Sequence, residues 1–156
     1  MIKLVRVDHR LVHGQVAFAW TKFLNADCIL VASDALMKDE LKMAGLRMAK
    51  PSGVKLVMKS IEDSAEALNS GVTDKYKLMI LCESVEDIYR LAAKTNCITA
   101  INLGGMKSGE NRRQISKAVH VSDEDIALIK ELMDKGIAVS VQMVPDDTQT
   151  DVAKLI

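Results

Sequence analysis

RVDHRLVHGQV, residues Arg6–Val16, joins an apolar run to a segment with helical periodicity. The apolar run starts at Ile2 and is typical of a buried strand. At its end, two guanidinium groups and two imidazoles are gathered between Arg6 and His13. The first turn of a helix offers unpaired N–H donors and the positive end of the helix dipole, and arginine adds a fixed positive fork. This segment therefore has the ingredients of an anion or phosphoryl site.

Outward from this segment, short apolar runs alternate with amphipathic stretches along the whole chain. The predicted strands are Ile2–Val7, Cys28–Ala32, Val54–Met58, Leu78–Cys82, Ile98–Ile101, Ala118–Val121 and Ala138–Gln142. The predicted helices are Gln15–Leu24, Asp34–Ala49, Ile61–Ser70, Val85–Lys94 and Asp123–Lys135, with a short terminal helix in Thr148–Leu155. Such alternation predicts an α/β fold with a mainly parallel sheet covered on both faces, whose ligands bind beyond the carboxyl ends of the strands.

The expected strand tips differ in how many polar groups they carry, and the tip at Asp8–His13 is the richest. Ser84 stands at another tip, followed by acidic residues that are typical of a helix start. We interpret Gly104-Gly105 as a turn that lets another loop approach. The stretch Gly104–Arg113 is the one long polar connection, and we expect a mobile surface loop there.

The composition points to one domain over residues 1–156. Lysine plus arginine and aspartate plus glutamate number 21 each, a balance that argues against a nucleic-acid partner. No apolar segment is long enough to span a membrane and no signal peptide is recognisable, so we expect a cytoplasmic protein. The chain has three cysteines, Cys28, Cys82 and Cys97, and they are not closely spaced. We therefore expect reduced core residues rather than disulfides or a zinc site.

His13 is a candidate nucleophile because a neutral imidazole nitrogen can attack a phosphoryl group and hold it covalently. Arg10 or Arg6, together with backbone amides, would stabilise the resulting dianion, and Gly14 would allow close backbone approach. On spacing alone, it is about equally plausible that His13 only caps the turn or the start of the helix. A thiol nucleophile at Cys82 lacks a nearby base and is less favoured.

His9 is a rival to His13, four residues earlier. The two histidines could form a zinc pair, but no third ligand of suitable spacing is present, so we expect no metal. Asp8 could orient an arginine or a histidine, or hydrogen-bond the backbone of its own turn, and both readings stay open.

RVDHRLVHGQV, followed by Trp20, resembles the motif of the IIB component of the mannose/fructose/sorbose family of the bacterial phosphoenolpyruvate-dependent phosphotransferase system. Further matches are Val31-Ala-Ser-Asp34, Asn102-Leu-Gly-Gly105 and Gln142-Met-Val-Pro-Asp146, so the resemblance spans nearly the whole chain. It implies a three-layer open α/β sheet, mostly parallel with one antiparallel strand. His9 occupies a variable position of the motif, where acidic or amide residues are more usual.

The resemblance also implies a phosphocarrier. His13 would take a phosphoryl group from a IIA phosphohistidine and pass it to a sugar entering through membrane IIC and IID subunits, at the inner face of the membrane. Arg10, Gly14 and Gln15 would bind the phosphoryl group, with Ser84 as a weaker candidate and Asp8 as an orienting residue. No cofactor is expected. A noncatalytic anion- or nucleotide-binding regulatory domain is the alternative. The sequence determines neither the sugar nor the oligomeric state, and a homo-oligomer remains open.

Overall fold

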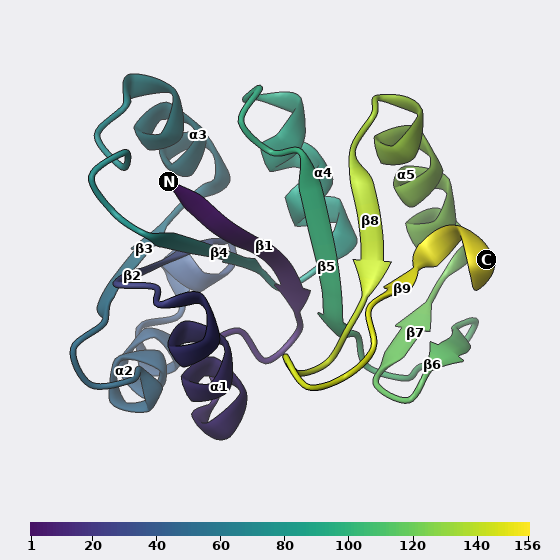
Figure 1. The fold of residues 1–156 in the computed structure, drawn as a ribbon, viewed down its shortest axis with the longest axis horizontal. Helices are drawn as coiled ribbons and strands as arrows, with labels where there is room; N and C mark the ends of the chain where they lie inside the picture. Colours follow the sequence, from purple (N-terminus) through teal and green to yellow (C-terminus); the bar gives the residue numbers. More distant parts are fainter.

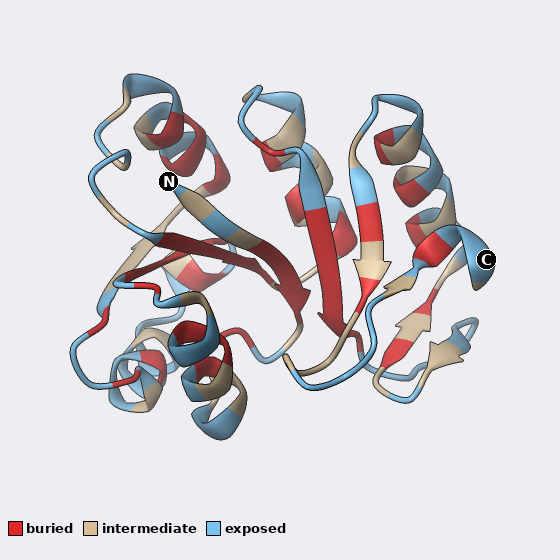
Figure 2. Cartoon of the chain, viewed as in Figure 1, coloured by how far each residue is buried: buried red, intermediate tan, exposed pale blue.

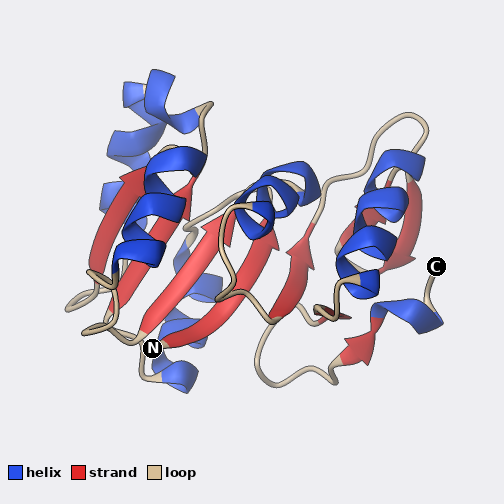
Figure 3. Cartoon of the chain, turned by 90° about the horizontal axis from the view of Figure 1, so that it is seen from above, coloured by secondary structure: helices blue, strands red, loops and turns tan.

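The computed structural model describes residues 1–156 and contains a seven-stranded sheet with helices on both faces (Figures 1 and 3). Along the chain, the strands of this sheet are β1 (Ile2–Asp8), β2 (Cys28–Ala32), β3 (Lys55–Lys59), β4 (Leu78–Cys82), β5 (Ala100–Gly105), β8 (Ala138–Val141) and β9 (Thr150–Asp151). Their spatial order is β3-β2-β4-β1-β5-β8-β9, parallel except for β9, which runs antiparallel to β8. The predicted fold class is confirmed.

Five α-helices cover the sheet. They are α1 (Gly14–Leu24), α2 (Glu40–Ala49), α3 (Ile61–Ser70), α4 (Val85–Ala93) and α5 (Asp123–Asp134). α1 and α2 pack on one face through one buried cluster, and α3, α4 and α5 pack on the other through a second cluster. The strand residues beneath them are mostly buried, including the carboxyl-terminal halves of β1 and β5 (Figure 2). Both apolar faces of the sheet thus contribute to the core.

The order of connections creates a switch point beside β1. From β1 the chain crosses to β2 through α1 on one face, whereas from the adjacent β4 it crosses to β5 through α4 on the other face. A crevice opens at the carboxyl edge of an α/β sheet where neighbouring connections diverge in this way. The segment that follows β1 therefore lies where this fold favours ligand binding.

The predicted helix Asp34–Ala49 is wrong in its first part. The structure has a 3-10 turn, η1 (Leu36–Lys38), and only then α2. Asp39 leaves the helical conformation with φ −126° and ψ 83°, and its side chain accepts the Lys42 amide as the cap of α2. A local side-chain bond to the backbone therefore divides the segment.

The strand predicted at Ile98–Ile101 is displaced, because β5 begins at Ala100 and continues through both glycines. Gly104 and Gly105 are buried strand residues and do not form a turn. The predicted mobile loop Gly104–Arg113 is likewise wrong at both ends: Met106 is buried and bridged to Val119, and Arg113 begins a strand.

The predicted strand Ala118–Val121 is confirmed as β7 (Val119–Val121), but its partner was missed. β6 (Arg113–Ser116) pairs with β7 in a separate antiparallel hairpin. The predicted terminal helix Thr148–Leu155 is instead β9 followed by the 3-10 turn η2 (Val152–Lys154). None of the helices has the length and apolar character needed to cross a membrane.

Candidate functional site

The side chains that follow β1 converge on the buried carboxylate of Asp8. Its Oδ2 accepts a hydrogen bond from Nη2 of Arg6 at 3.1 Å and lies 3.3 Å from Nε2 of His13. Its Oδ1 accepts from the backbone amide of Arg10 at 3.0 Å and from Nε of the same residue at 3.4 Å. Asp8 itself is fully buried. The carboxylate thus links the strand, the turn and the start of α1.

The pKa of Asp8 lies below its ordinary value. Burial acts to raise the pKa, but the Arg10 amide and the charges of Arg6 and Arg10 lower it by more. Asp8 is therefore ionised at neutral pH and can only accept hydrogen bonds. It follows that Nε2 of His13 carries the proton in the contact with Asp8, and Nδ1 of the neutral ring keeps its lone pair.

The turn between β1 and α1 is fixed by local bonds. The Leu11 amide donates to the Asp8 carbonyl at 2.9 Å, and Leu11 adopts a left-handed φ of 59° while its side chain is buried. Gly14 also has a positive φ, of 30°. Asp8 thus accepts from the backbone of its own turn and also lies within hydrogen-bond distance of His13, a geometry compatible with both readings left open by the sequence.

His13 occupies the N-cap position of α1, with a quarter of its side chain exposed. Burial and the nearby Arg10 lower the pKa of His13, and the opposing effect of Asp8 does not fully offset them. α1 has no side-chain cap and no acidic residue in its first turn, whereas α2, α3, α4 and α5 have both. The first turn of α1 therefore carries no acidic residue of its own beside the positive end of the helix dipole.

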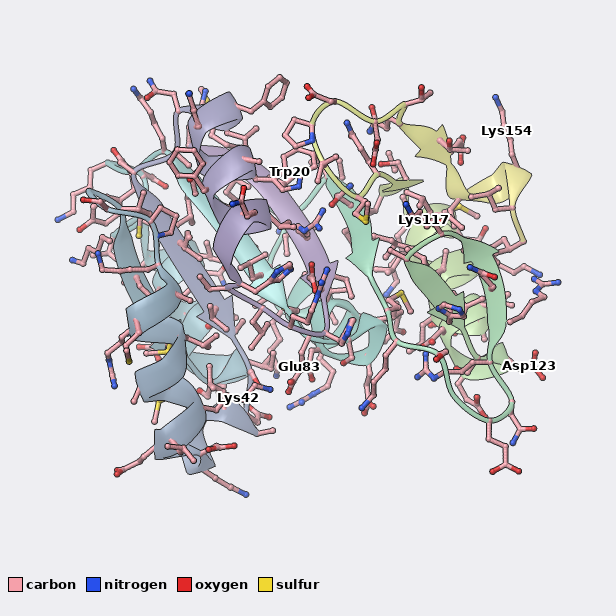
Figure 4. All side chains as sticks on the ribbon, turned by 90° about the horizontal axis from the view of Figure 1, so that it is seen from below. Trp20, Lys42, Glu83, Lys117, Asp123 and Lys154 are labelled. Carbon is pink, nitrogen blue, oxygen red and sulfur yellow. The ribbon has the colours of Figure 1, made fainter.

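Ser84 and His9 lie on the other side of the turn. Both line a polar cavity of about 520 Å³ that also includes Glu83 and Lys42, which form an ion pair at 3.2 Å (Figure 4). Ser84 caps α4, and its hydroxyl accepts a hydrogen bond from the backbone amide of Asp87. Nδ1 of His9 is buried, has no hydrogen-bond partner and lies 4.0 Å from Asp8.

Several residues of the site were missed by the sequence reasoning. Asn102 on β5 accepts from Nη1 of Arg6 at 2.7 Å, and the Gln142 carbonyl accepts from the same nitrogen at 3.1 Å. Arg6 is only 1% exposed, which disfavours its predicted alternative role as a phosphate ligand. The sequence signal was present in the motif segments that contain Asn102 and Gln142, but nothing local connects them with Arg6.

Two alternative chemistries find little support. Cys82 is buried, and burial raises the pKa of its thiol, so its thiolate is disfavoured. Across the chain, no group of three or more His, Cys, Asp or Glu side chains is arranged to hold a metal ion.

Residues 2–156 match the family described as PTS system sorbose subfamily IIB component. The PTS system fructose-specific EIIB component of Bacillus subtilis (strain 168) is 34% identical over 155 residues, which cover 99% of this chain and 95% of that protein. The PTS system mannose-specific EIIAB component of Escherichia coli (strain K12) is 33% identical over 156 residues, which span all of this chain but 48% of that protein.

Solved structures agree with these relatives. The crystal structure of the IIBSor domain of the sorbose permease from Klebsiella pneumoniae superposes with a TM-score of 0.93 at 28% identity, covering 99% of this chain and 94% of that one. A family match over nearly the whole length, relatives above 30% identity and a shared fold lead to one conclusion. The chain belongs to the mannose/fructose/sorbose family of IIB components of the sugar phosphotransferase system.

Proposed function

We propose that His13 is the phosphoryl carrier of this IIB component. It accepts the phosphoryl group from a phosphohistidine on a IIA protein and passes it to a sugar delivered by membrane IIC and IID subunits, on the cytoplasmic side of the membrane. The observation that carries the proposal is the 3.3 Å contact between His13 Nε2 and the ionised Asp8, which leaves Nδ1 as the nucleophile. The E. coli relative named EIIAB supports the choice of a IIA donor.

The transfer step follows from this tautomer. The Nδ1 lone pair of His13 attacks phosphorus, the bond from phosphorus to the donor nitrogen breaks, and the donor imidazole recovers its electron pair. The His13 ring keeps its Nε2 proton and becomes more positive as the new bond forms. The carboxylate of Asp8 stabilises that charge, as an aspartate does for a catalytic imidazolium. The lowered pKa of His13 favours the reactive neutral form beforehand.

The start of α1 supplies the anion binding. The amides of Gly14 and Gln15 belong to the first turn, where backbone N–H groups lack an intrahelical acceptor. Arg10 is tethered through Nε to Asp8 while nearly half of its side chain is exposed, so its terminal nitrogens are free to meet phosphoryl oxygens. Transfer then rests on positioning and charge stabilisation. Ser84 is a weaker candidate, because its hydroxyl already caps α4.

In the second step, the phosphoryl group is transferred from His13 to a sugar hydroxyl. The sugar oxygen attacks phosphorus and its hydroxyl proton is released to solvent, while the P–N bond breaks and the electron pair returns to Nδ1. An imidazole leaves readily because its pKa is near neutral. Both partners must reach the same nitrogen in turn, and the partly exposed position of His13 at the edge of the sheet suits this exchange.

A reconstituted assay tests the proposal. Phosphoenolpyruvate with labelled phosphate, enzyme I, HPr and a cognate IIA should label the wild-type chain with an acid-labile, alkali-stable phosphoryl group. Label should be lost in His13→Ala and retained in His9→Ala, the matched control on the same turn. Label that persists in His13→Ala would overturn the assignment. Saturable nucleotide binding without any label would favour the regulatory-domain alternative.

A further inference from the structure

The guanidinium of Arg6 is buried, with 1% of the residue exposed, and it donates three hydrogen bonds within the site. It donates to Asp8 through Nη2, and to Asn102 and the Gln142 carbonyl through Nη1. These acceptors come from β1, β5 and the segment after β8. A single rigid group thus joins three parts of the chain that are distant in sequence.

The space for this guanidinium is provided by Gly104. A Cβ atom at this position would lie 1.9 Å from Cζ of Arg6, so the guanidinium would have to move out of its present position. On the other side, Arg6 lies over the ring of Trp20, 5.4 Å from its centre. Trp20 extends from α1 toward the C-terminal segment and donates to the Met143 carbonyl at 3.0 Å (Figure 4). The guanidinium is therefore fixed by three hydrogen bonds, by close packing against Gly104 and by the ring of Trp20.

This arrangement makes one oxygen of Asp8 serve two donors. Oδ2 accepts from Arg6 and faces Nε2 of His13, so the orientation of the carboxylate toward the imidazole depends on the arginine fork. Arginine presents two nitrogens in fixed geometry, which an ammonium group does not. Supporting bonds of this kind determine how accurately a reactive group is placed, and a shift of about 1 Å can cost about 100-fold in rate.

We infer that Arg6 is a positioning residue for phosphoryl transfer: through Asp8, its buried guanidinium fixes His13 as the Nε2–H tautomer with Nδ1 directed outward. The inference rests on the proposed function of His13. It gives the Asn102, Gly104 and Trp20 contacts a shared role, since all three hold Arg6 in place.

The test compares Arg6→Gln and Arg6→Lys with the wild type in two measurements. The first is the ¹⁵N spectrum of His13 in the unphosphorylated protein, which reports the tautomer directly. The second is the steady-state transfer from phospho-IIA. Arg6→Gln should mix the two tautomers and lower kcat about 10- to 100-fold with little change in KM. Arg6→Lys restores the charge without the fork and should recover part of the rate.

Gly104→Ala provides a second route to the same perturbation if Arg6→Gln does not fold. This substitution removes no polar group from the chain but displaces the guanidinium of Arg6, so it should also mix the tautomers. Gly45→Ala is the matched control, because an added Cβ there meets nothing within 4 Å, and tautomer and rate should stay as in the wild type. A pure Nε2–H tautomer with unchanged kcat in folded Arg6→Gln or Gly104→Ala would overturn the inference. Failure of the proposed function looks different: the wild type itself would carry no label on His13.

Discussion

Replacement of Asp8 by asparagine tests the electrostatic centre of the site. The substitution keeps the shape of the side chain but removes the charge and turns one acceptor into a donor. Oδ2 faces Arg6 and His13, and Oδ1 faces two nitrogens of Arg10, so the new NH₂ group meets a donor in either orientation. Removing one partner of a buried ion pair costs about 3–5 kcal/mol. Because Arg6 keeps Asn102 and the Gln142 carbonyl, we expect about 3 kcal/mol.

The assay is urea unfolding at neutral pH, followed by circular dichroism, with the same variant tested for phosphoryl transfer. Transfer should fall by about 100-fold or more, because the histidine tautomer is no longer enforced. A double-mutant cycle with Arg6→Met should show strong coupling, since the double variant leaves neither charge unpaired. A loss below about 1 kcal/mol in Asp8→Asn, or purely additive effects in the cycle, would refute the reasoning.

Asp87→Asn is the matched control, the same substitution at a nearby helix start. Burial, reinforced by Glu83, raises the pKa of Asp87 to about 6. Because the pKa of Asp87 is raised in the folded protein, its charged form destabilises the fold above about pH 6. Asp87→Asn should therefore stabilise the protein at neutral pH, and the gain should shrink as the pH falls below about 6. Asp8 has the opposite sign: its contribution to stability is present at neutral pH and is lost in acid, as the pH falls through its lowered pKa.

Three further predictions concern the turn, the strand and the thiols. The rate of His13 phosphorylation should fall as the pH is lowered, with its midpoint below 6.5, because burial lowers the pKa of His13; a midpoint above 6.5 would contradict this. Gly105→Ala should lower the free energy of unfolding by about 1–3 kcal/mol in urea, because the new Cβ would lie 2.9 Å from Oδ1 of Asp8; an unchanged midpoint would contradict the close approach. One thiol, the exposed Cys97, should react with a water-soluble disulfide reagent in the native protein and all three in urea, because Cys28 and Cys82 are buried; a second fast-reacting native thiol would show that one of these is accessible.

The sequence predicts best where the determinants are local. Asp8, Arg10 and His13 lie within one turn, so the polar cluster and the helix start after it were visible in a single segment. The sheet followed from apolar runs of a few residues. The break at Asp39 was missed because the apolar periodicity continues across it, and only the capping bond divides the helix.

The support of the site could not be predicted in this way. Arg6 lies 96 residues from Asn102 and 136 from Gln142 in the sequence, and no periodicity relates positions so far apart. A pair of glycines after an apolar run predicts a turn, since glycines within a strand are uncommon. A glycine inside a strand marks the close approach of another group, and here the approaching groups are Arg6 and Asp8.

The central claim is that Asp8 directs the reaction to one nitrogen of His13. The most direct measurement is the NMR spectrum of the protein phosphorylated by phospho-IIA, with ³¹P and ¹⁵N observed together. We expect a single phosphoryl group bonded to Nδ1 of His13, with the proton retained on Nε2 beside Asp8 at neutral pH. A phosphoryl group on Nε2, or on any residue other than His13, would contradict it.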